Sequence, residues 1–263
     1  MKKKTGKSGE DALVKAVIAD VDAPLFTDST YLKRERSLGS LTQLIVQDLG
    51  IAIVTGAYSG PDAFPIEAEI CKQYDASRSI VREALKVLNA KGLLIARPRR
   101  GTRVRPERDW NLLDPDVLYW MLKRRFSLEL LVDFTHTRLG IEPAAAALAA
   151  RTATPEQKQS IMTALRHMDE ATQGAFDPLE ADISFHLSLL HASNNRFFYH
   201  LSPVVETALR FSIRYVNLKL HRSYALVADH KAIADAVLAG DAEAAAEASR
   251  VQLQAALDTM VAP

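Results

Sequence analysis

Residues 41–104 constrain the fold of this chain more than any other segment. Apolar residues recur there at spacings of three and four, and the pattern is interrupted by turn residues. Only Asp75-Ala76 separates the second helical pattern from the third, for which Ser77 is a good N-cap. Three helices with a tight second turn and a two-stranded ribbon make a winged helix-turn-helix. The predicted elements are helices at Leu41–Val54, Pro65–Tyr74 and from Ser77 to about Lys91, and strands at Leu93–Ala96 and Thr102–Val104.

Basic residues follow the third helix and the predicted wing. Arg78, Arg82 and Lys86 step by four along one helix face, near the end where recognition helices meet base edges. A solvated charged face has the same pattern, but the wing favours a nucleic acid. Five arginines crowd around Gly101 there without a neighbouring acid, and a polyanion balances such a cluster. The predicted DNA-contacting residues are Arg78, Ser79, Arg82, Lys86, Arg99, Arg100, Gly101 and Arg103.

The charge distribution separates the chain into a basic and an acidic part. Between Lys33 and Arg108 there are 14 Lys and Arg residues against 8 Asp and Glu, which is +6 in a chain of net charge +1. The remainder is therefore −5, as expected for a nucleic-acid reader joined to another module. The single cysteine excludes an internal disulfide and a thiolate metal cluster. No membrane span and no secretory signal is indicated, so we expect a cytoplasmic protein.

Beyond a linker at Pro106–Pro115, every long segment has helical periodicity and none has a strand pattern. We therefore predict a mainly α protein, in which the winged helix-turn-helix is joined to an all-α antiparallel bundle of six to seven helices. The expected domains are a flexible basic tail (1–32), the DNA-binding domain (33–105), the linker (106–115) and an effector-binding and dimerisation domain (116–263). Its predicted helices are Asp116–Lys123, Leu128–Arg151, Pro155–Gln173, Pro178–Ala192, Arg196–Leu220, Leu226–Ala239 and Asp241–Val261.

Polar residues within the predicted bundle are candidates for a ligand site. Asp182 and His186 are four residues apart, so one helix face presents a carboxylate and an imidazole that can share a metal or a polar ligand. A solvent-facing pair explains this spacing as well. His230 is a third candidate, although lone histidines often stand at helix starts. Arg138, with Glu142 four residues on, is either a buried ion pair or an anion receptor.

The N-terminal motifs carry a family resemblance. Together they are similar to the signature of the GntR family of bacterial transcription regulators, over about Leu41–Val104. The sequence has Phe-Pro-Ile-Glu at 64–67, where the family usually has Leu-Pro-Ser-Glu with a serine that often caps the second helix. The resemblance implies that Arg78, Arg82 and Gly101 contact operator DNA. The matching stretches are Gly56–Tyr58, Phe64–Ile70, Ser77–Leu85, Lys91–Leu94 and Arg100–Val104.

The second half resembles the effector domain, called FCD, of the FadR-like branch of that family. In this branch an Asp and three His commonly bind a divalent metal, usually zinc or nickel, which helps to hold a carboxylate effector. The resemblance implies that Asp182, His186 and His230 are metal ligands, and it puts Gln252 at the position of the third His. A glutamine is a poor zinc ligand. The metal is then held by three residues with the effector, or the effector is bound by hydrogen bonds alone. The matching stretches are Arg138–Ala150, Asp182–His186, Ala192–Asn195, His230–Val237 and Gly240–Ala245.

The segment Trp110–Leu122 is similar to the interdomain segment of sugar-acid regulators in this branch. The resemblance implies a homodimeric repressor of a sugar-acid operon, released from palindromic operator DNA by an aldonate or hexuronate. A regulator that answers to another carboxylate, or to no ligand, remains an alternative. A metal-dependent enzyme is a weaker one, because no nucleophile, phosphate-loop or general-base motif is present. The predicted effector-binding residues are Arg138, Asp182, His186, Arg214, His230 and Gln252. Arg214 and Arg210 equally fit a salt bridge to a neighbouring helix.

Overall fold

The computed structural model describes residues 13–17, 40–58, 64–97, 101–124, 126–221 and 226–262. The chain forms two compact units. One comprises residues 26–126, and the other comprises residues 1–25 and 127–263. Residues 13–17, within the predicted tail, are helical. The rest of the predicted tail, residues 1–32, lies outside the described part of the chain.

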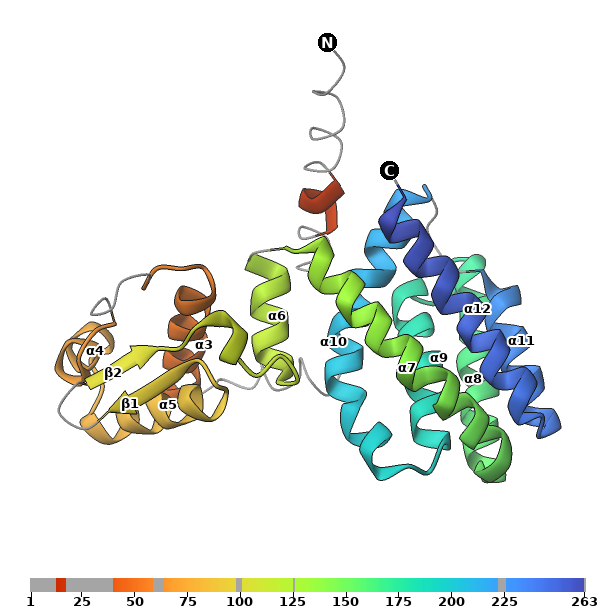
Figure 1. The fold of residues 1–263 in the computed structure, drawn as a ribbon, viewed down its shortest axis with the longest axis horizontal. Helices are drawn as coiled ribbons and strands as arrows, with labels where there is room; N and C mark the ends of the chain where they lie inside the picture. Colours follow the sequence, from red (N-terminus) through yellow and green to blue (C-terminus); the bar gives the residue numbers. More distant parts are fainter. Residues whose placement is uncertain are drawn as a thin grey trace, which may run out of the picture. The chain divides into compact units, whose positions relative to one another are not determined.

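The N-terminal unit has the predicted order of helices and strands (Figure 1). Ser77 caps α5 by accepting a hydrogen bond from the backbone N–H of Ile80, while Asp75 takes the left-handed conformation that ends α4. Helix α4 has no side-chain cap at Ile66, as the missing serine predicts, and Glu69 accepts from the Ile66 N–H instead. Its elements are α3 (Leu41–Val54), α4 (Glu67–Tyr74), α5 (Arg78–Ala90), β1 (Leu94–Arg97), β2 (Gly101–Val104), η1 (Glu107–Asp109) and α6 (Pro115–Arg124).

Helix α6 packs on α3 within this unit. The Trp120 ring lies so close to Gly50 that a Cβ there would be 2.3 Å from a ring carbon. Lys91, just after α5, binds Asp114 at 2.8 Å and Asp116 at 2.6 Å, and its ammonium lies 5.8 Å from the Trp120 ring centroid. The sequence-based boundary after residue 115 assigns this helix to the bundle, whereas its tertiary contacts group it with the DNA-binding unit.

The second unit is a helical bundle whose starts follow their predicted caps. Thr154, Asp177 and Asp241 each accept hydrogen bonds from the first turn of the helix that follows. Neighbouring helices α8 and α9 pack together, and α12 returns along α7 (Figure 1). The described helices are α7 (Leu128–Thr152), α8 (Pro155–Thr172), α9 (Pro178–Ala192), α10 (Arg196–Lys219), α11 (Val227–Ala239) and α12 (Ala242–Val261). The predicted fold class is confirmed.

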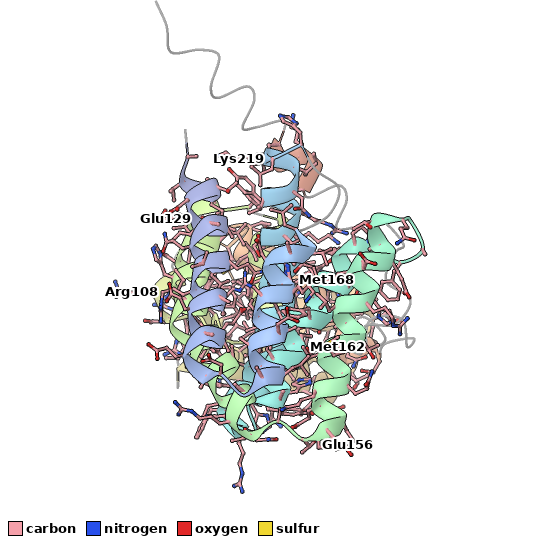
Figure 2. The ribbon with its side chains drawn as sticks, turned by 90° about the vertical axis from the view of Figure 1, so that its right-hand side faces the viewer. Arg108, Glu129, Glu156, Met162, Met168 and Lys219 are labelled. Atoms are coloured by element: carbon pink, nitrogen blue, oxygen red, sulfur yellow. The ribbon has the colours of Figure 1, made fainter. Side chains whose placement is uncertain are left out.

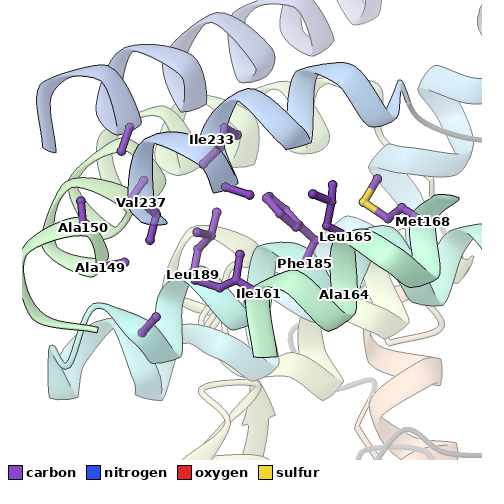
Figure 3. Close-up of a cluster of buried hydrophobic side chains, with 14 of the residues drawn as sticks. Ala149, Ala150, Ile161, Ala164, Leu165, Met168, Phe185, Leu189, Ile233 and Val237 are labelled. Atoms are coloured by element: carbon purple, nitrogen blue, oxygen red, sulfur yellow. The ribbon is translucent and has the colours of Figure 1, made fainter. Parts of the chain in front are cut away.

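The core of the bundle lies between α7, α8, α9 and α11. Phe185 and Leu189 of α9 meet Ile161 of α8 and Ile233 of α11, and small alanines of α7 let the helices approach closely (Figure 3). On α8, Met168 is 4% exposed and Met162 is 36% exposed, so the helix has distinct inner and outer faces (Figure 2). Among the described helices, none is long and apolar enough to cross a membrane.

Candidate functional sites

The recognition helix α5 presents its predicted basic residues to solvent. Arg78, Arg82 and Lys86 are exposed, while the opposite face buries Val81, Ala84, Leu85 and Leu88 in the unit core. Ile80, in the first turn of α5, is half-buried. Ser79 is also exposed, and its hydroxyl lies 2.9 Å from that of Ser77.

Arg82 is held by an acid that the sequence analysis did not single out. Its Nε donates to Glu67 Oε2 of α4 at 2.9 Å, while both side chains stay largely exposed. Such a surface pair adds little stability. It does fix the direction of a long side chain on the face expected to meet DNA.

The wing is the antiparallel pair β1–β2, in which Ile95 lies opposite Arg103 and Arg97 opposite Gly101. Gly101 has a φ of +72° and open space around its Cα, which suits the tip of a wing that approaches DNA. Arg103 is half-buried. Arg99 and Arg100 lie outside the described residues.

Three polar side chains meet inside the bundle, as the sequence predicts. Asp182 and His186 come from α9 and His230 from α11, and all three are buried. Asp182 Oδ1 lies 3.3 Å from His186 Nε2 and 3.2 Å from His230 Nε2. One ligand atom from each residue lies within 4.8 Å of the others, so a single cation can reach all three.

The Nδ1 atom of His186 is tied to Glu142 of α7. The Nδ1–Glu142 Oε2 distance is 2.8 Å, and Arg138 Nε donates to the other carboxylate oxygen at 2.5 Å. Burial raises the pKa of Glu142, but Arg138 and His186 outweigh burial and lower it to about 2. Arg138 Nη2 also lies 3.4 Å from Nδ1, yet the shorter contact to an anionic carboxylate places a proton on Nδ1. The free lone pair of a neutral His186 is then on Nε2, facing Asp182.

The Nδ1 atom of His230 is also held by a hydrogen-bond acceptor, in this case a backbone carbonyl. Its Nδ1 lies 2.9 Å from the Leu226 carbonyl oxygen, which only accepts, so Nδ1 carries the proton and Nε2 is the basic atom. Burial raises the pKa of Asp182, but His230 and His186 outweigh it and hold that pKa well below its usual range. Two imidazole lone pairs and a carboxylate oxygen therefore face one point. That arrangement is stable with a cation or a proton between them, and the outer carboxylate and carbonyl are the usual partners of metal-binding histidines.

Gln252 of α12 completes one side of this cluster. Its amide nitrogen lies 2.5 Å from His230 Nε2. Its amide oxygen is buried and accepts no hydrogen bond from the described residues. The amide is thus adjacent to the cluster, and its accepting oxygen is unused.

The cluster forms the polar end of a cavity of about 220 Å³ between α10, α11 and α12. Arg138 lines it and donates to Glu142 through Nε and Nη2, so Nη1 is the guanidinium nitrogen that this ion pair does not use. Ser212, Asn217 and Thr259 add further polar groups. The other lining residues are Asp182, His186, Ile213, Val216, Leu220, Leu226, Asp229, His230, Gln252, Leu253, Ala255, Ala256 and Met260.

Arg214 is the one predicted effector residue that this cavity does not include. It is buried on α10, but Ser212, Ile213 and Val216 are the neighbours that line the cavity. The geometry does not support the predicted Arg214–effector contact. Arg210 pairs with Glu180 at 2.5 Å and Glu206 at 2.7 Å, which matches the structural salt bridge weighed as its alternative.

Comparison with known proteins agrees with both halves of this description. Residues 41–104 match the gntR family of bacterial regulatory proteins, and residues 133–255 match the FCD domain. The galactonate operon transcriptional repressor of Escherichia coli (strain K12) is 34% identical over 210 residues, covering 79% of this chain and 91% of the repressor.

The chain belongs to the GntR family.

Other relatives of this GntR regulator differ in the operon that they control. A protein of Escherichia coli (strain K12) that carries the name of an L-lactate dehydrogenase operon regulatory protein is 30% identical, over 74% of this chain and 77% of that protein. A solved structure of Lar, which controls the agr system of Listeria monocytogenes, covers 86% of this chain and 98% of its own at a TM-score of 0.50 and 15% identity, and so shows a shared fold. The protein is therefore a DNA-binding transcription regulator with an effector domain, and not an enzyme.

Proposed function

We propose that this GntR regulator is a homodimeric, cytoplasmic repressor of a sugar-acid operon, released from a palindromic operator by an aldonate or hexuronate. The observation that carries the proposal is the cavity in the FCD domain, where Arg138 and the Asp182–His186–His230 cluster share one polar end. Similarity to a galactonate operon repressor over most of the chain supports the choice of ligand class.

Asp182, His186 and His230 would hold a divalent metal ion such as zinc or nickel. The fit rests on the tethered Nδ1 atoms, which leave both Nε2 lone pairs directed at the Asp182 carboxylate. When bound, the ion would supply a positive centre for the carboxylate and hydroxyl oxygens of the effector. Glu142 and the Leu226 carbonyl keep both imidazoles in the tautomer that the ion requires.

Arg138 would orient the effector carboxylate through Nη1, the terminal nitrogen not used by Glu142. A sugar acid also needs partners for its hydroxyl groups, and Ser212, Asn217 and Thr259 line the same cavity. These groups would discriminate against an acid that lacks the hydroxyls. Without the hydroxyl, the protein group that would bind it stays buried and unpaired.

Repression requires that the effector bind more tightly to one arrangement of the DNA-binding units than to the other. A coupling of about 1–3 kcal/mol is typical of such switches. Arg78, Arg82, Lys86 and the wing would supply the contacts that are lost on release, with the arginines reading guanine edges or clamping phosphates.

Fluorescence anisotropy of the full chain on the DNA upstream of its own operon tests this proposal. Galactonate, glucuronate and L-lactate are added separately, at a fixed salt concentration. Release by a sugar acid but not by lactate is the expected result. Release by lactate alone moves the protein to the second candidate, a regulator of another carboxylate class, for which the L-lactate relative is the specific precedent. DNA binding that no acid changes contradicts effector control.

A further inference from the structure

Gln252 is an amide side chain that lies beside the carboxylate and the two imidazoles of the cluster. It reaches into the polar end of the cavity from α12, while the other three come from α9 and α11. Its amide nitrogen caps His230 Nε2, and its buried amide oxygen accepts no hydrogen bond from the described residues. A buried acceptor left in this state costs free energy, so the site has a use for that oxygen that the polypeptide alone does not satisfy.

Rotation of the amide by 180° about its last side-chain bond exchanges oxygen and nitrogen at nearly the same positions. The oxygen then lies beside His230 Nε2, where two lone pairs face each other. That contact is unfavourable unless a metal cation or a proton lies between them. The nitrogen-inward amide thus suits a cluster without a metal ion, and the oxygen-inward amide suits a cluster that holds one.

We infer that Gln252 is the fourth protein ligand of the metal site, through its amide oxygen, and that it sets which metals the site prefers. The inference rests on the metal site of the proposed function. With Gln252 the donors are two imidazoles, a carboxylate and a neutral amide oxygen, so half of them are oxygens. Carboxylate and carbonyl oxygens suit manganese and magnesium, whereas imidazole favours zinc and nickel. Gln252 therefore narrows the preference for zinc over manganese, and a histidine at this position widens it.

The matched variants are Gln252→His, Gln252→Leu and Gln254→His. Leu keeps much of the volume of Gln but donates no oxygen. Gln254 is exposed on the same helix and binds Asp258, so its replacement controls for an added surface imidazole. Asp182→Ala removes the charged ligand of the proposed site.

The experiment measures zinc and manganese affinities of the chelator-treated full chain by competition with a metal indicator, with folding checked by circular dichroism. The ratio of manganese to zinc dissociation constants should rise by about tenfold or more in Gln252→His, because a direct ligand matters at least as much as outer-shell partners, whose loss costs 10–100-fold. Gln252→Leu should weaken the binding of manganese by about tenfold, on the same grounds. Gln254→His should match the wild type.

The outcomes separate this inference from the proposed function. The role of Gln252 alone is overturned if Asp182→Ala abolishes metal binding while the two Gln252 variants behave like the wild type. In that case the manganese-to-zinc ratio of dissociation constants is unchanged in Gln252→His, and the manganese affinity is unchanged in Gln252→Leu. Wild-type protein that binds neither metal overturns the metal site, and the Gln252 inference with it. If Gln252→His does not fold, Gln252→Leu tests the inference. Its manganese affinity must then fall below that of the wild type, and an unchanged affinity overturns the inference.

Discussion

At the scale of the residue, Glu142 links the two functional parts of the bundle cavity. Its carboxylate binds Arg138 on its own helix and His186 on α9, and all three side chains are buried. It therefore fixes both the guanidinium that we propose faces the effector and the tautomer of a histidine that we propose binds the metal ion. Replacement of Arg138 cannot be interpreted as loss of an effector contact alone, because it leaves a buried carboxylate without its cation.

An Arg138→Ala variant should lose about 3–5 kcal/mol of unfolding free energy, the usual result of breaking a buried ion pair from one side. The double variant Arg138→Met/Glu142→Leu should recover much of that loss, since it removes both charges and keeps the volume. Urea denaturation followed by far-ultraviolet circular dichroism measures both. A loss below about 1 kcal/mol in the single variant would place this pair with exposed salt bridges and contradict its burial.

We expect Glu67 to affect DNA recognition through its ion pair with Arg82. A Glu67→Gln variant should bind random DNA more tightly, because a negative charge near the phosphates is gone, but should discriminate the operator less well because Arg82 is no longer oriented. The specific-to-nonspecific affinity ratio should fall by about tenfold, the lower part of the range for one base contact. Anisotropy titrations with operator and scrambled DNA give the ratio.

Glu83→Gln is the control for this prediction. The substitution removes an equal negative charge from α5, but Glu83 pairs with Lys86 and not with Arg82. Equal specific-to-nonspecific affinity ratios in the two variants would show that Glu67 has no specific role in operator recognition.

At the scale of the element, helix starts were predictable and packing partners were not. Thr154, Asp177 and Asp241 cap α8, α9 and α12 through hydrogen bonds within three residues, so the sequence alone indicates these boundaries. The position of α6 depends on Trp120 lying against Gly50, which is 70 residues away. Local periodicity carries no information on that contact.

The residues of the cavity were predictable within a helix, but the contacts between helices were not. The helical spacing of four residues pairs Asp182 with His186 and Arg138 with Glu142. His230 was a third candidate from the sequence, and the family resemblance adds Gln252. The contact between Glu142 and His186 joins two helices, and local periodicity does not specify it. Arg214 does not line the cavity, because a single residue step from Ile213 on α10 turns a side chain by about 100°, so its contact with an effector stays a prediction.

The contact between α3 and α6 gives a prediction with an internal control. Gly50→Ala adds a methyl group that meets the Trp120 ring at 2.3–2.8 Å, so overpacking of about 1–3 kcal/mol should exceed the helix-propensity gain of about 1 kcal/mol. Gly140→Ala on α7 meets no atom of the described residues within 4 Å and should stabilise the bundle by about 0.8–1 kcal/mol.

Both tryptophans of the chain, Trp110 and Trp120, are in the N-terminal unit, so tryptophan fluorescence reports its unfolding separately from the bundle. The fluorescence midpoint should fall in Gly50→Ala and stay unchanged in Gly140→Ala. A higher midpoint in Gly50→Ala would mean that α6 moves away from α3 without cost, and that its assignment to the DNA-binding unit is wrong.

At the scale of the whole molecule, the chain combines a basic DNA-binding unit with a bundle whose cavity has a polar end. The family assignment establishes regulation, while the ligand class depends on the groups around Arg138 and Asp182. We propose that this cavity binds a sugar acid with the help of a metal ion, and ligand binding must then stabilise the folded bundle.

Calorimetric unfolding of the chelator-treated full chain tests that claim most directly. The protein is scanned with aldonates, uronates and short hydroxy acids, each with and without added zinc, nickel or manganese. A sugar acid at 100 times its dissociation constant should stabilise the bundle by about 2.7 kcal/mol. The shift should require the metal and disappear in Asp182→Ala. If no sugar acid raises the unfolding temperature with any of the metals, the cavity is not a sugar-acid sensor.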